Sequence, residues 1–335
     1  MAPIHRRELK LTGGTVREGL ARPDSSLPYL YDATGQVVEL AGWSAGRRME
    51  LNDRLHVHGA LLFRGFSDVD RNAFFDFVRQ VSGEPLEYTE RSSPRTDTGR
   101  RIYTSTEQPP DQAIFLHNEQ SYSLDWPMRL FFFCELAATD GGATPIADSR
   151  RILNRIPADI RDRLVDRGYR YVRHFRAGLG LSWQESFGTD DPLEVERYCS
   201  DQSISYQWRP NGSLTTSQVR PVMRQHPITH EETWFNHLTF FNVGTLNQEI
   251  RKALLSAMPE DELPNNTYYG DGEPIEAEVL QLLQRAYTSE LVSVPWQAGD
   301  IMMIDNMLAS HGRESFTPPR RVLVAMTEPW SSALS

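Results

Sequence analysis

The sequence is poor in cysteine, and its two cysteines, Cys134 and Cys199, lie far apart. Two thiols cannot form the disulfide framework of a small secreted protein, and no Cys-x-x-Cys pair is present for a redox or zinc site. Cys134 lies in the apolar stretch 130–136 and is expected to be a small buried side chain. The cysteine content therefore argues against a disulfide-stabilised secreted domain.

Long apolar runs are also missing. No segment approaches the roughly 18 apolar residues that a membrane-spanning helix needs. The opening stretch, Met1–Glu8, has no apolar core of the kind found in secretory signal peptides. We therefore expect a cytoplasmic protein without a membrane partner.

Basic clusters are absent as well. The net charge is −10, and no run of lysine and arginine offers the positive face that nucleic acids require. The sequence contains neither a P-loop nor a G-x-G-x-x-G motif. These absences leave a small molecule as the expected partner, and the sequence does not indicate an oligomeric state.

The residues that are present describe a globular protein, with 335 residues, 39% hydrophobic and 24% charged. Many short apolar segments are bounded by turn residues, and helical patterns fall mainly outside them. Because no regular βαβα alternation occurs, we expect an α+β, mainly β fold, a double-stranded β-helix (jelly roll) with flanking helices. Strands are predicted near residues 60–66, 112–116, 128–137, 169–175, 232–236, 291–295, 301–305 and 321–327. Helices are predicted near residues 70–81, from 150 onward, and near 156–167, 191–199, 250–258 and 275–287.

The chain is predicted to form one domain over residues 1–335, since no repeat or low-complexity segment divides it. A core at about 55–330 would follow a polar lead-in at 1–50. Residues 89–112 are rich in Ser, Thr, Arg and Pro and predict a long polar loop. A second polar, irregular stretch at about 176–230 is predicted to be an insert that acts as a lid.

The chemistry is concentrated at His117 and Glu119, which follow an apolar, strand-like segment. Residues i and i+2 of a strand point to the same face, so an imidazole and a carboxylate would converge. Such a pair could be only a structural hydrogen-bonded couple. His311, which follows another apolar strand and the turn Asp305-Asn306, favours a metal instead. Two histidines and one carboxylate, with open positions, are the ligand set of non-haem Fe(II) oxygenases.

Two other motifs point to different chemistry and are less well supported. Gly42–Gly46 matches the G-x-S-x-G nucleophile elbow of hydrolases, but no parallel-sheet pattern surrounds it. His117–Glu119 matches the H-x-E half of a zinc deaminase, but the required P-C-x-x-C is absent.

At these positions the sequence resembles a known family, the taurine dioxygenase branch of the Fe(II)/2-oxoglutarate-dependent oxygenases. The matching motifs, in order, are H-N-E at 117–119, G-G-x-T at 141–144, and D-N-x-x-x-x-H and R-R at 305–321. They extend over roughly residues 55–330.

The resemblance implies a role for each matching residue. His117, Glu119 and His311 would bind Fe(II) and carry the catalysis. Thr144 and Arg321 would bind the distal carboxylate of 2-oxoglutarate, through paired hydrogen bonds in the case of the arginine. Arg320 is the alternative arginine. Arg321 is preferred because the alternating residues Arg321, Leu323 and Ala325 are expected to face the interior of the fold. O₂ is the second cosubstrate.

Two departures narrow the expected substrate. The carboxylate is Glu where most of the branch has Asp, which resembles the clavaminate synthase group and the hydroxylases of nonribosomal-peptide clusters. The position four residues after Arg321 is Ala325, where taurine dioxygenase has a second arginine for its sulfonate. A sulfonate is therefore not expected. The stretches 90–95 and 142–150 also look like those of amino-acid hydroxylases from such clusters.

We therefore expect hydroxylation of an amino acid or an amino-acid derivative, free or carrier-bound, in natural-product (antibiotic) biosynthesis. Desaturation, epoxidation or cyclisation by the same cofactor chemistry is the alternative, and halogenation is disfavoured because Glu119 fills the halide position. A non-catalytic jelly-roll binding protein is the alternative from another class. Candidate substrate-binding residues are Arg91, Ser93, Arg95, Asn236 and His237.

Overall fold

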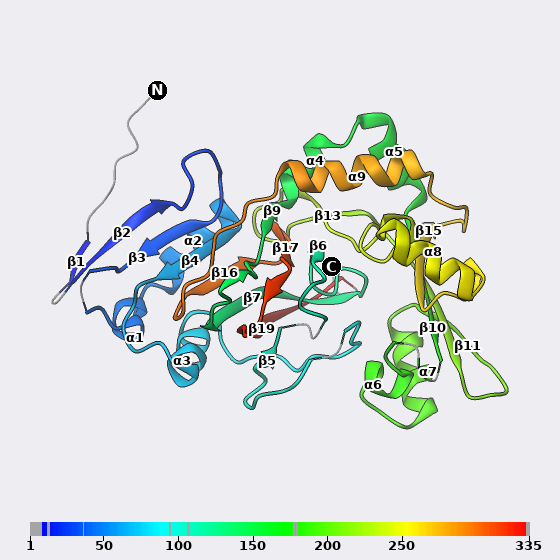
Figure 1. Ribbon diagram of the computed structural model, residues 1–335, viewed down its shortest axis with the longest axis horizontal. Coiled ribbons are helices and arrows are strands. Elements are labelled where there is room, and N and C mark those ends of the chain that lie inside the picture. Colours follow the sequence, from blue (N-terminus) through cyan, green and yellow to red (C-terminus); the bar gives the residue numbers. More distant parts are fainter. Residues whose placement is uncertain are drawn as a thin grey trace.

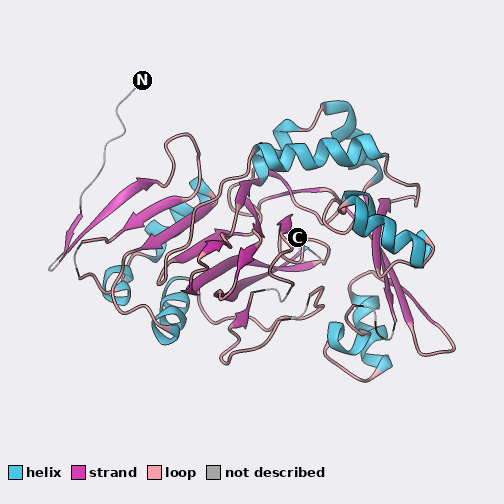
Figure 2. Ribbon diagram, viewed as in Figure 1, coloured by secondary structure: helices cyan, strands magenta, loops and turns pink. Residues whose placement is uncertain are grey.

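The computed structural model describes residues 9–11, 14–35, 37–93, 95–105, 108–176, 178 and 180–332. Figure 1 shows a strand-rich centre, with helices of the middle and later chain along the top and the right of the view. Figure 2 shows the same division by secondary structure, with strands through the middle and helices at the margins. The expectation of sheets with flanking helices is confirmed in this coarser form.

The largest sheet has eight strands in the order β1-β2-β3-β4-β16-β7-β19-β5. Its neighbours are antiparallel except β3 and β4, which are parallel. The central strand β7 is buried along most of its length, because another layer packs against each face of the sheet. The strands are β1 (Leu9–Leu11), β2 (Gly14–Leu20), β3 (Tyr29–Asp32), β4 (Ala60–Arg64), β5 (Tyr103–Thr104), β7 (Asp125–Leu136), β16 (Ile301–Asp305) and β19 (Arg321–Ser331).

A three-stranded sheet, β6-β17-β9, lies against one face of the large sheet. Phe132 and Val322 of the large sheet belong to one buried apolar cluster with Ile146 and Ala309 of the small sheet. This packing places the two sheets face to face, and the site residues lie on the smaller one. Its strands are β6 (Ile114–His117), β9 (Ile146–Asp148) and β17 (Ala309–Arg313).

Three helices cover the opposite face of the large sheet. The Asp70 carboxylate accepts hydrogen bonds from the backbone N–H groups of Asn72 and Ala73, and so caps the third helix as its sequence predicts. That helix buries Phe74 and Phe77 against the sheet. The helices are α1 (Leu40–Ser44), α2 (Arg48–His58) and α3 (Arg71–Val81).

The remaining elements form a second lobe beside the small sheet, and a buried cluster that includes Leu116, Tyr122, Tyr171, Trp234 and Leu283 joins the two. This lobe has a four-stranded sheet in the order β11-β12-β10-β15 and a two-stranded sheet β13-β14. Its strands are β10 (Tyr169–Phe175), β11 (Ser205–Trp208), β12 (Leu214–Arg220), β13 (Met223–Gln225), β14 (Glu232–Trp234) and β15 (Asn265–Tyr269). Its helices are α4 (Ser149–Arg155), α5 (Ala158–Arg167), α6 (Trp183–Phe187), α7 (Pro192–Asp201), α8 (Gln248–Ala257), α9 (Ala277–Ser289) and the 3₁₀ turns η1 (Val243–Thr245) and η2 (Glu260–Glu262). The small β8-β18 pair consists of β8 (Asp140–Gly141) and β18 (Phe316–Thr317).

Three local expectations were wrong. The lead-in at 1–50 is not merely polar chain, because β2 and β3 extend the large sheet. The stretch 176–230 is not irregular, since α6, α7, β11 and β12 lie within it. Residues 291–295 form no strand beyond a single bridge between Val292 and Ile146.

The structure also excludes the hydrolase motif. Ser44 lies in α1 rather than at a strand-to-helix turn, it is buried, and its hydroxyl donates to the carbonyl of Ala41. A nucleophilic serine must instead be presented to the substrate. Among the described residues, no helix is both long and apolar enough to cross a lipid bilayer.

Candidate metal centre

His117 and His311 lie opposite each other on neighbouring antiparallel strands, β6 and β17. Their ring centroids are 4.5 Å apart. The His117 Nδ1–H donates to the carbonyl of Phe115 at 2.9 Å, which leaves Nε2 as the free lone pair. Strand pairing thus brings together two imidazoles that are far apart in the sequence. His311 lies on strand β17, which begins after the Asp305-Asn306 turn.

Glu119 lies in the turn that follows β6, so strand alternation does not position it. The side chain of Asn306 does so instead. Its Oδ1 accepts from the Glu119 backbone N–H at 2.8 Å, and its Nδ2 donates to the Glu119 carbonyl at 2.9 Å. The Asn118 side chain closes the link by donating to the Asn306 carbonyl at 2.7 Å. The D-N turn before β17 therefore holds the carboxylate next to both histidines.

Together, His117, Glu119 and His311 form a compact and buried group. One potential ligand atom from each residue lies within 4.8 Å of the others. Burial lowers the pKa of His117, and burial together with the charges of His117 and Arg95 lowers that of His311 well below its ordinary value. Burial alone would raise the pKa of Glu119, but Arg95 and His117 outweigh it and hold that pKa below normal. Two neutral imidazoles and one ionised carboxylate fit a divalent iron.

A small hollow of about 30 Å³ adjoins this group, next to His311, and Arg320 and Thr144 line it. The volume suffices for about one small polar group, such as the end of a dicarboxylate. The Arg320 Nε donates to the Gly142 carbonyl at 2.7 Å, and Thr144 accepts from Trp296 at 3.1 Å. Burial and the neighbouring Arg313 lower the pKa of Arg320 to about 10. Among the described residues, no carboxylate forms an ion pair with Arg320.

The glycine pair of the G-G-x-T motif is explained by this packing. Gly142 has φ +73°, and a Cβ there would lie 2.9 Å from the Arg320 side chain. At Gly141, with φ +67°, a Cβ would lie 2.2 Å from the Ser315 carbonyl oxygen. Only glycine accommodates both the backbone conformation and the close approach.

The preference for Arg321 over Arg320 was wrong. The Arg321 side chain is 55% exposed and forms an ion pair with Glu135 at 3.0 Å, away from the hollow. The register of β19 shifts between Arg321 and Val322, and the alternating set Leu323 and Ala325 packs toward the helices. The opposite face points toward the site.

The opposite face also changes which residue stands at the position of taurine dioxygenase's second arginine. Counted from Arg320, the residue four positions later is Val324 rather than Ala325, and it lines the hollow. The chain at the start of β19 therefore supplies one cation, Arg320, and strand β19 an apolar side chain, Val324, to this region.

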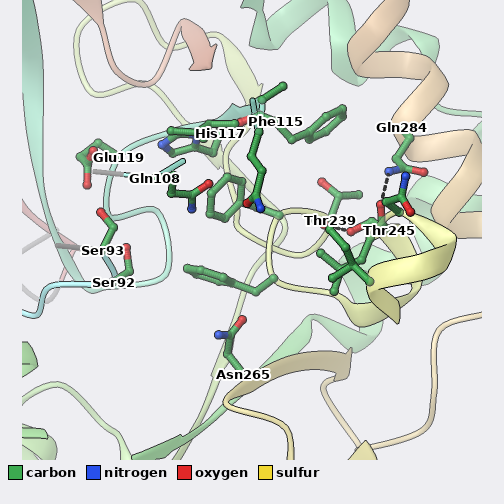
Figure 3. Close-up of a pocket in the computed structure, with 18 of the residues that line it drawn as sticks. Ser92, Ser93, Gln108, Phe115, His117, Glu119, Thr239, Thr245, Asn265 and Gln284 are labelled. Atoms are coloured by element: carbon green, nitrogen blue, oxygen red, sulfur yellow. Dashed lines mark hydrogen bonds between the residues drawn. The ribbon is translucent and has the colours of Figure 1, made fainter. Parts of the chain in front are cut away.

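A larger cavity of about 650 Å³ extends from the metal centre. Figure 3 shows Glu119, His117, Ser92 and Ser93 toward one end of it and Gln284 and other polar residues toward the other. Its lining includes Ser92, Ser93, Arg95, Gln108, Asp111, Gln112, Phe115, His117, Glu119, Thr239, Phe240, Thr245, Leu246, Asn247, Ile250, Asn265 and Gln284.

The structure separates the five candidate substrate residues. Ser93 and Arg95 line the cavity, whereas Arg91, Asn236 and His237 do not. The prediction that these three residues line the substrate site was wrong, and each makes a different contact. Arg91 donates to the Tyr88 carbonyl at 3.2 Å, and the buried Asn236 amide donates to the Val222 carbonyl at 2.6 Å. The His237 ring is buried behind His117, with ring centroids 5.7 Å apart, and is hydrogen-bonded to Ser121.

Sequence reasoning missed the wall on the far side of the cavity. Phe240 packs against the His117 ring with centroids 4.4 Å apart, and Thr239, Asn265 and Gln284 continue the wall. These residues come from separate turns, strands and helices. No local pattern could have grouped them, because only the packing of the second lobe brings them together.

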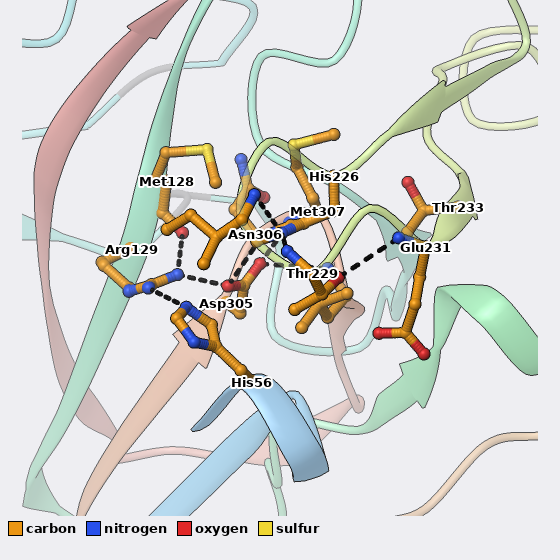
Figure 4. Close-up of polar contacts among 12 residues, drawn as sticks. His56, Met128, Arg129, His226, Thr229, Glu231, Thr233, Asp305, Asn306 and Met307 are labelled. Atoms are coloured by element: carbon orange, nitrogen blue, oxygen red, sulfur yellow. Dashed lines mark hydrogen bonds and ion pairs between the residues drawn. The ribbon is translucent and has the colours of Figure 1, made fainter. Parts of the chain in front are cut away.

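A buried polar network lies behind the metal centre (Figure 4). Asp305 forms an ion pair with Arg129 and accepts a hydrogen bond from His226 Nε2 at 3.2 Å, while Arg129 also contacts His56 at 2.8 Å. The other Asp305 oxygen accepts from two backbone N–H groups of the following turn, at Met307 and residue 308. Burial would raise the pKa of Asp305, but Arg129 and His226 lower it to about 2. This network fixes the turn that carries Asn306.

Comparison with known proteins agrees with this geometry. The family model "Taurine catabolism dioxygenase TauD, TfdA family" matches residues 26–327. The dapdiamide synthesis protein DdaC of Enterobacter agglomerans is 40% identical over 279 residues, 83% of this chain and 85% of that protein. A clavaminate synthase-like protein of Arabidopsis thaliana is 32% identical over 288 residues, 82% and 83% of the two chains. The crystal structure of PvcB from Pseudomonas aeruginosa shares the fold, with 16% identity, a TM-score of 0.57 and coverage of 93% and 91%.

Proposed function

Because the chain belongs to the taurine catabolism dioxygenase TauD, TfdA family, we propose that it oxidises an amino acid or an amino-acid derivative in natural-product biosynthesis. It is an Fe(II)- and 2-oxoglutarate-dependent dioxygenase. The reaction that we favour is hydroxylation. The observation that carries the proposal is the buried group of two imidazoles and one carboxylate at the end of a large cavity.

We assign Fe(II) to His117, Glu119 and His311. When bound, Fe(II) with 2-oxoglutarate and O₂ supplies the oxidant for a substrate C–H bond, while 2-oxoglutarate loses CO₂ and becomes succinate. The chain's own part is to hold and orient the reactants. The Phe115 carbonyl fixes the His117 ring, and Asn306 fixes the backbone of Glu119.

We assign the distal carboxylate of 2-oxoglutarate to Arg320, with Thr144 beside it. Arg320 is largely buried and faces the small hollow next to His311. A buried guanidinium without a carboxylate partner is costly, and an anionic ligand removes that cost. The Thr144 hydroxyl can add a hydrogen bond on the same side.

The cavity supports a substrate larger than a bare amino acid. At about 650 Å³ it lies in the range of pockets that enclose drug-sized ligands. Its wall mixes aromatic side chains with amide and hydroxyl groups, which suits an amino acid that carries an amide or acyl extension. The similarity to a dapdiamide synthesis protein supports the same class. The proposed substrates include an amino acid attached to a carrier protein.

We further propose that residues 1–335 form one catalytic domain whose facing sheets are a double-stranded β-helix. Residues 176–230 are its insert. Contacts between this insert and the loop near the cavity support a role in covering the site. Ser186 accepts from the Arg91 backbone N–H at 2.8 Å, and Tyr198 donates to Glu90 at 2.7 Å.

The test is 2-oxoglutarate consumption, followed as succinate formation, across free amino acids, their amides and dipeptides, and carrier-loaded amino acids. We expect stimulation by one of these classes and little by taurine. Product mass separates hydroxylation or epoxidation, which add oxygen, from desaturation or cyclisation, which remove hydrogen. Anaerobic titration with Fe(II) and 2-oxoglutarate tests the alternative of a non-catalytic binding protein, which would give no visible charge-transfer band.

A further inference from the structure

Arg95 occupies an unusual place between the two hollows. It lies in the long loop that precedes β6, yet the whole residue is only 9% exposed. Arg95, Ile114 and His117 line both the 650 Å³ cavity and the small hollow. Its guanidinium stacks 4.8 Å above the ring of Tyr88, which fixes its plane. A buried cation therefore borders both spaces in which ligands would sit.

The hydrogen-bonding capacity of Arg95 is only partly used. Its Nη2 donates to Oε2 of Glu119 at 2.6 Å. Within the described chain, its Nε and Nη1 are buried and have no acceptor. Burying an N–H group of a charged side chain without a partner is costly, so such groups usually have an acceptor when a binding site is filled.

The charges of the assembled site point the same way. Glu119 forms an ion pair with Arg95 at 2.6 Å. Once Fe(II) is held by Glu119, that carboxylate is shared between the metal and Arg95. The charges of the metal, Glu119, a 2-oxoglutarate dianion, Arg320 and Arg95 then leave one excess positive charge. A buried excess charge favours an additional anionic group nearby.

From these observations we infer that Arg95 binds a ligand carboxylate through Nε and Nη1 while its Nη2 holds Oε2 of Glu119. The inference rests on the proposed function and specifies the ligand chemistry of the same site. Arg95 takes the place of a second cation on strand β19, where Val324 lies instead. Because Oε2 of Glu119 accepts from Arg95, the other carboxylate oxygen is the one that could serve a metal.

The carboxylate has two possible sources, since Arg95 borders both spaces. It can be the carboxylate of 2-oxoglutarate next to its keto group, or a carboxylate of the substrate. The experiment compares Arg95→Gln and the charge-conserving Arg95→Lys with wild type. Arg91→Gln is the matched control, because Arg91 lies in the same loop and over the same Tyr88 ring, 5.9 Å away, but lines neither hollow.

Three measurements follow. Circular dichroism establishes that each variant is folded, and Mn(II) binding, followed by the EPR signal of the free ion, reports on the metal site. In the cosubstrate arm, anaerobic titration of the Fe(II) protein with 2-oxoglutarate, followed by the visible band, measures the Kd for 2-oxoglutarate. The substrate arm compares aspartate with asparagine, glutamate with glutamine, and each stimulating amino acid with its α-amide as activators of 2-oxoglutarate turnover.

We expect both Arg95 variants to weaken carboxylate binding by about 10-fold to 100-fold in one arm, the range for a lost charge-assisted hydrogen bond, and Arg91→Gln to resemble wild type. A raised Kd for 2-oxoglutarate assigns the carboxylate to the cosubstrate. Loss of the preference for carboxylates over amides assigns it to the substrate. If neither arm changes, the inference is wrong, even if Mn(II) binding weakens, because Arg95 then serves only Glu119. If wild type itself gives no band with Fe(II) and 2-oxoglutarate, the proposed function fails instead.

Discussion

Charged side chains on the two sides of the metal centre differ in how completely they are paired. Behind it, Arg129 and Asp305 lie in a closed network with two histidines, and each charged group has a partner from the chain itself. In front of it, the buried Arg95 pairs with Glu119 but its Nε and Nη1 have no acceptor, and the part-buried Arg320 has no ion-pair partner among the described residues. The first arrangement stabilises the fold, and the second leaves charge for a ligand to neutralise.

This difference separates structural from functional arginines more clearly than burial does. Arg95 and Arg129 are buried and Arg320 is part-buried, so exposure alone does not distinguish the two groups. Breaking the network behind the centre should therefore change stability, while substitution of Arg320 in front should change ligand binding with little loss of stability. The predictions below test this division, from the largest expected effect to the smallest.

The largest effect is expected at the proposed iron ligands. His117→Ala or Glu119→Ala should abolish succinate formation and tight metal binding, because two of three ligands cannot hold Fe(II) in this geometry. Thermal unfolding of metal-free His117→Ala should change little by comparison, whereas Glu119→Ala should also lower stability because it leaves the buried Arg95 without its ion-pair partner. Metal content and 2-oxoglutarate turnover are the measurements, and normal turnover by either variant would show that the metal assignment is wrong.

The next effect concerns the network behind the centre. Arg129→Ala removes one partner of a fully buried ion pair, which leaves Asp305 uncompensated and should cost about 3–5 kcal/mol in the free energy of unfolding. Denaturant unfolding measures this loss. The control is Arg321→Ala, which removes an exposed ion pair with Glu135 and should cost less than about 1 kcal/mol. Equal losses in the two variants would contradict the division.

In front of the centre, Arg320→Ala should raise the Kd for 2-oxoglutarate about 10-fold to 100-fold, since a charge-assisted contact with the carboxylate is lost. Stability should hardly fall, because the arginine removed has no ion-pair partner among the described residues. Anaerobic titration of the visible band measures the affinity. Arg321→Ala again serves as the control and should bind 2-oxoglutarate as wild type does; the reverse order would restore Arg321 to the site.

A smaller effect should appear in the pH dependence of stability. The pKa of Asp305 is lowered from 3.8 to about 2 in the folded protein, so its ionised form stabilises the fold at pH values above the unfolded pKa. The shift corresponds to about 2 kcal/mol, which is lost as the pH falls from about 4 through 2. Unfolding of wild type and Asp305→Asn across this range tests it. The stability difference should be constant near pH 6 and shrink in acid, and a difference that grows in acid would refute the assignment.

Much of the site was predictable because short motifs carry it. The H-x-E spacing, the glycine pair before Thr144 and the D-N turn before His311 each reflect a local requirement, such as the positive φ of Gly142. The helix that begins after Asp70 and the strands β10 and β16 were also predictable, since their apolar periodicity and caps are local.

Other features were not predictable from local pattern. The choice between Arg320 and Arg321 depends on which face of β19 meets the site. Leu323 and Ala325 alternate with Arg321 as expected, but their face packs toward the helices, and the face of Val324 meets the site. Glu119 is positioned by Asn306, a residue distant in sequence, and not by strand geometry. Both outcomes depend on pairing partners that the neighbouring sequence does not specify.

By itself, the sequence determined the kind of chemistry, because two histidines, a carboxylate and the surrounding motif residues limit which metal and cosubstrate the site suits. Only the tertiary structure decided which arginines face that site, which side chains wall the cavity, and which buried charges are left without a partner. The physical reason is that the type of metal ligand is a property of single residues. The direction of a side chain, the enclosure of a cavity and the pairing of buried charges arise between segments that meet only when the sheets pack.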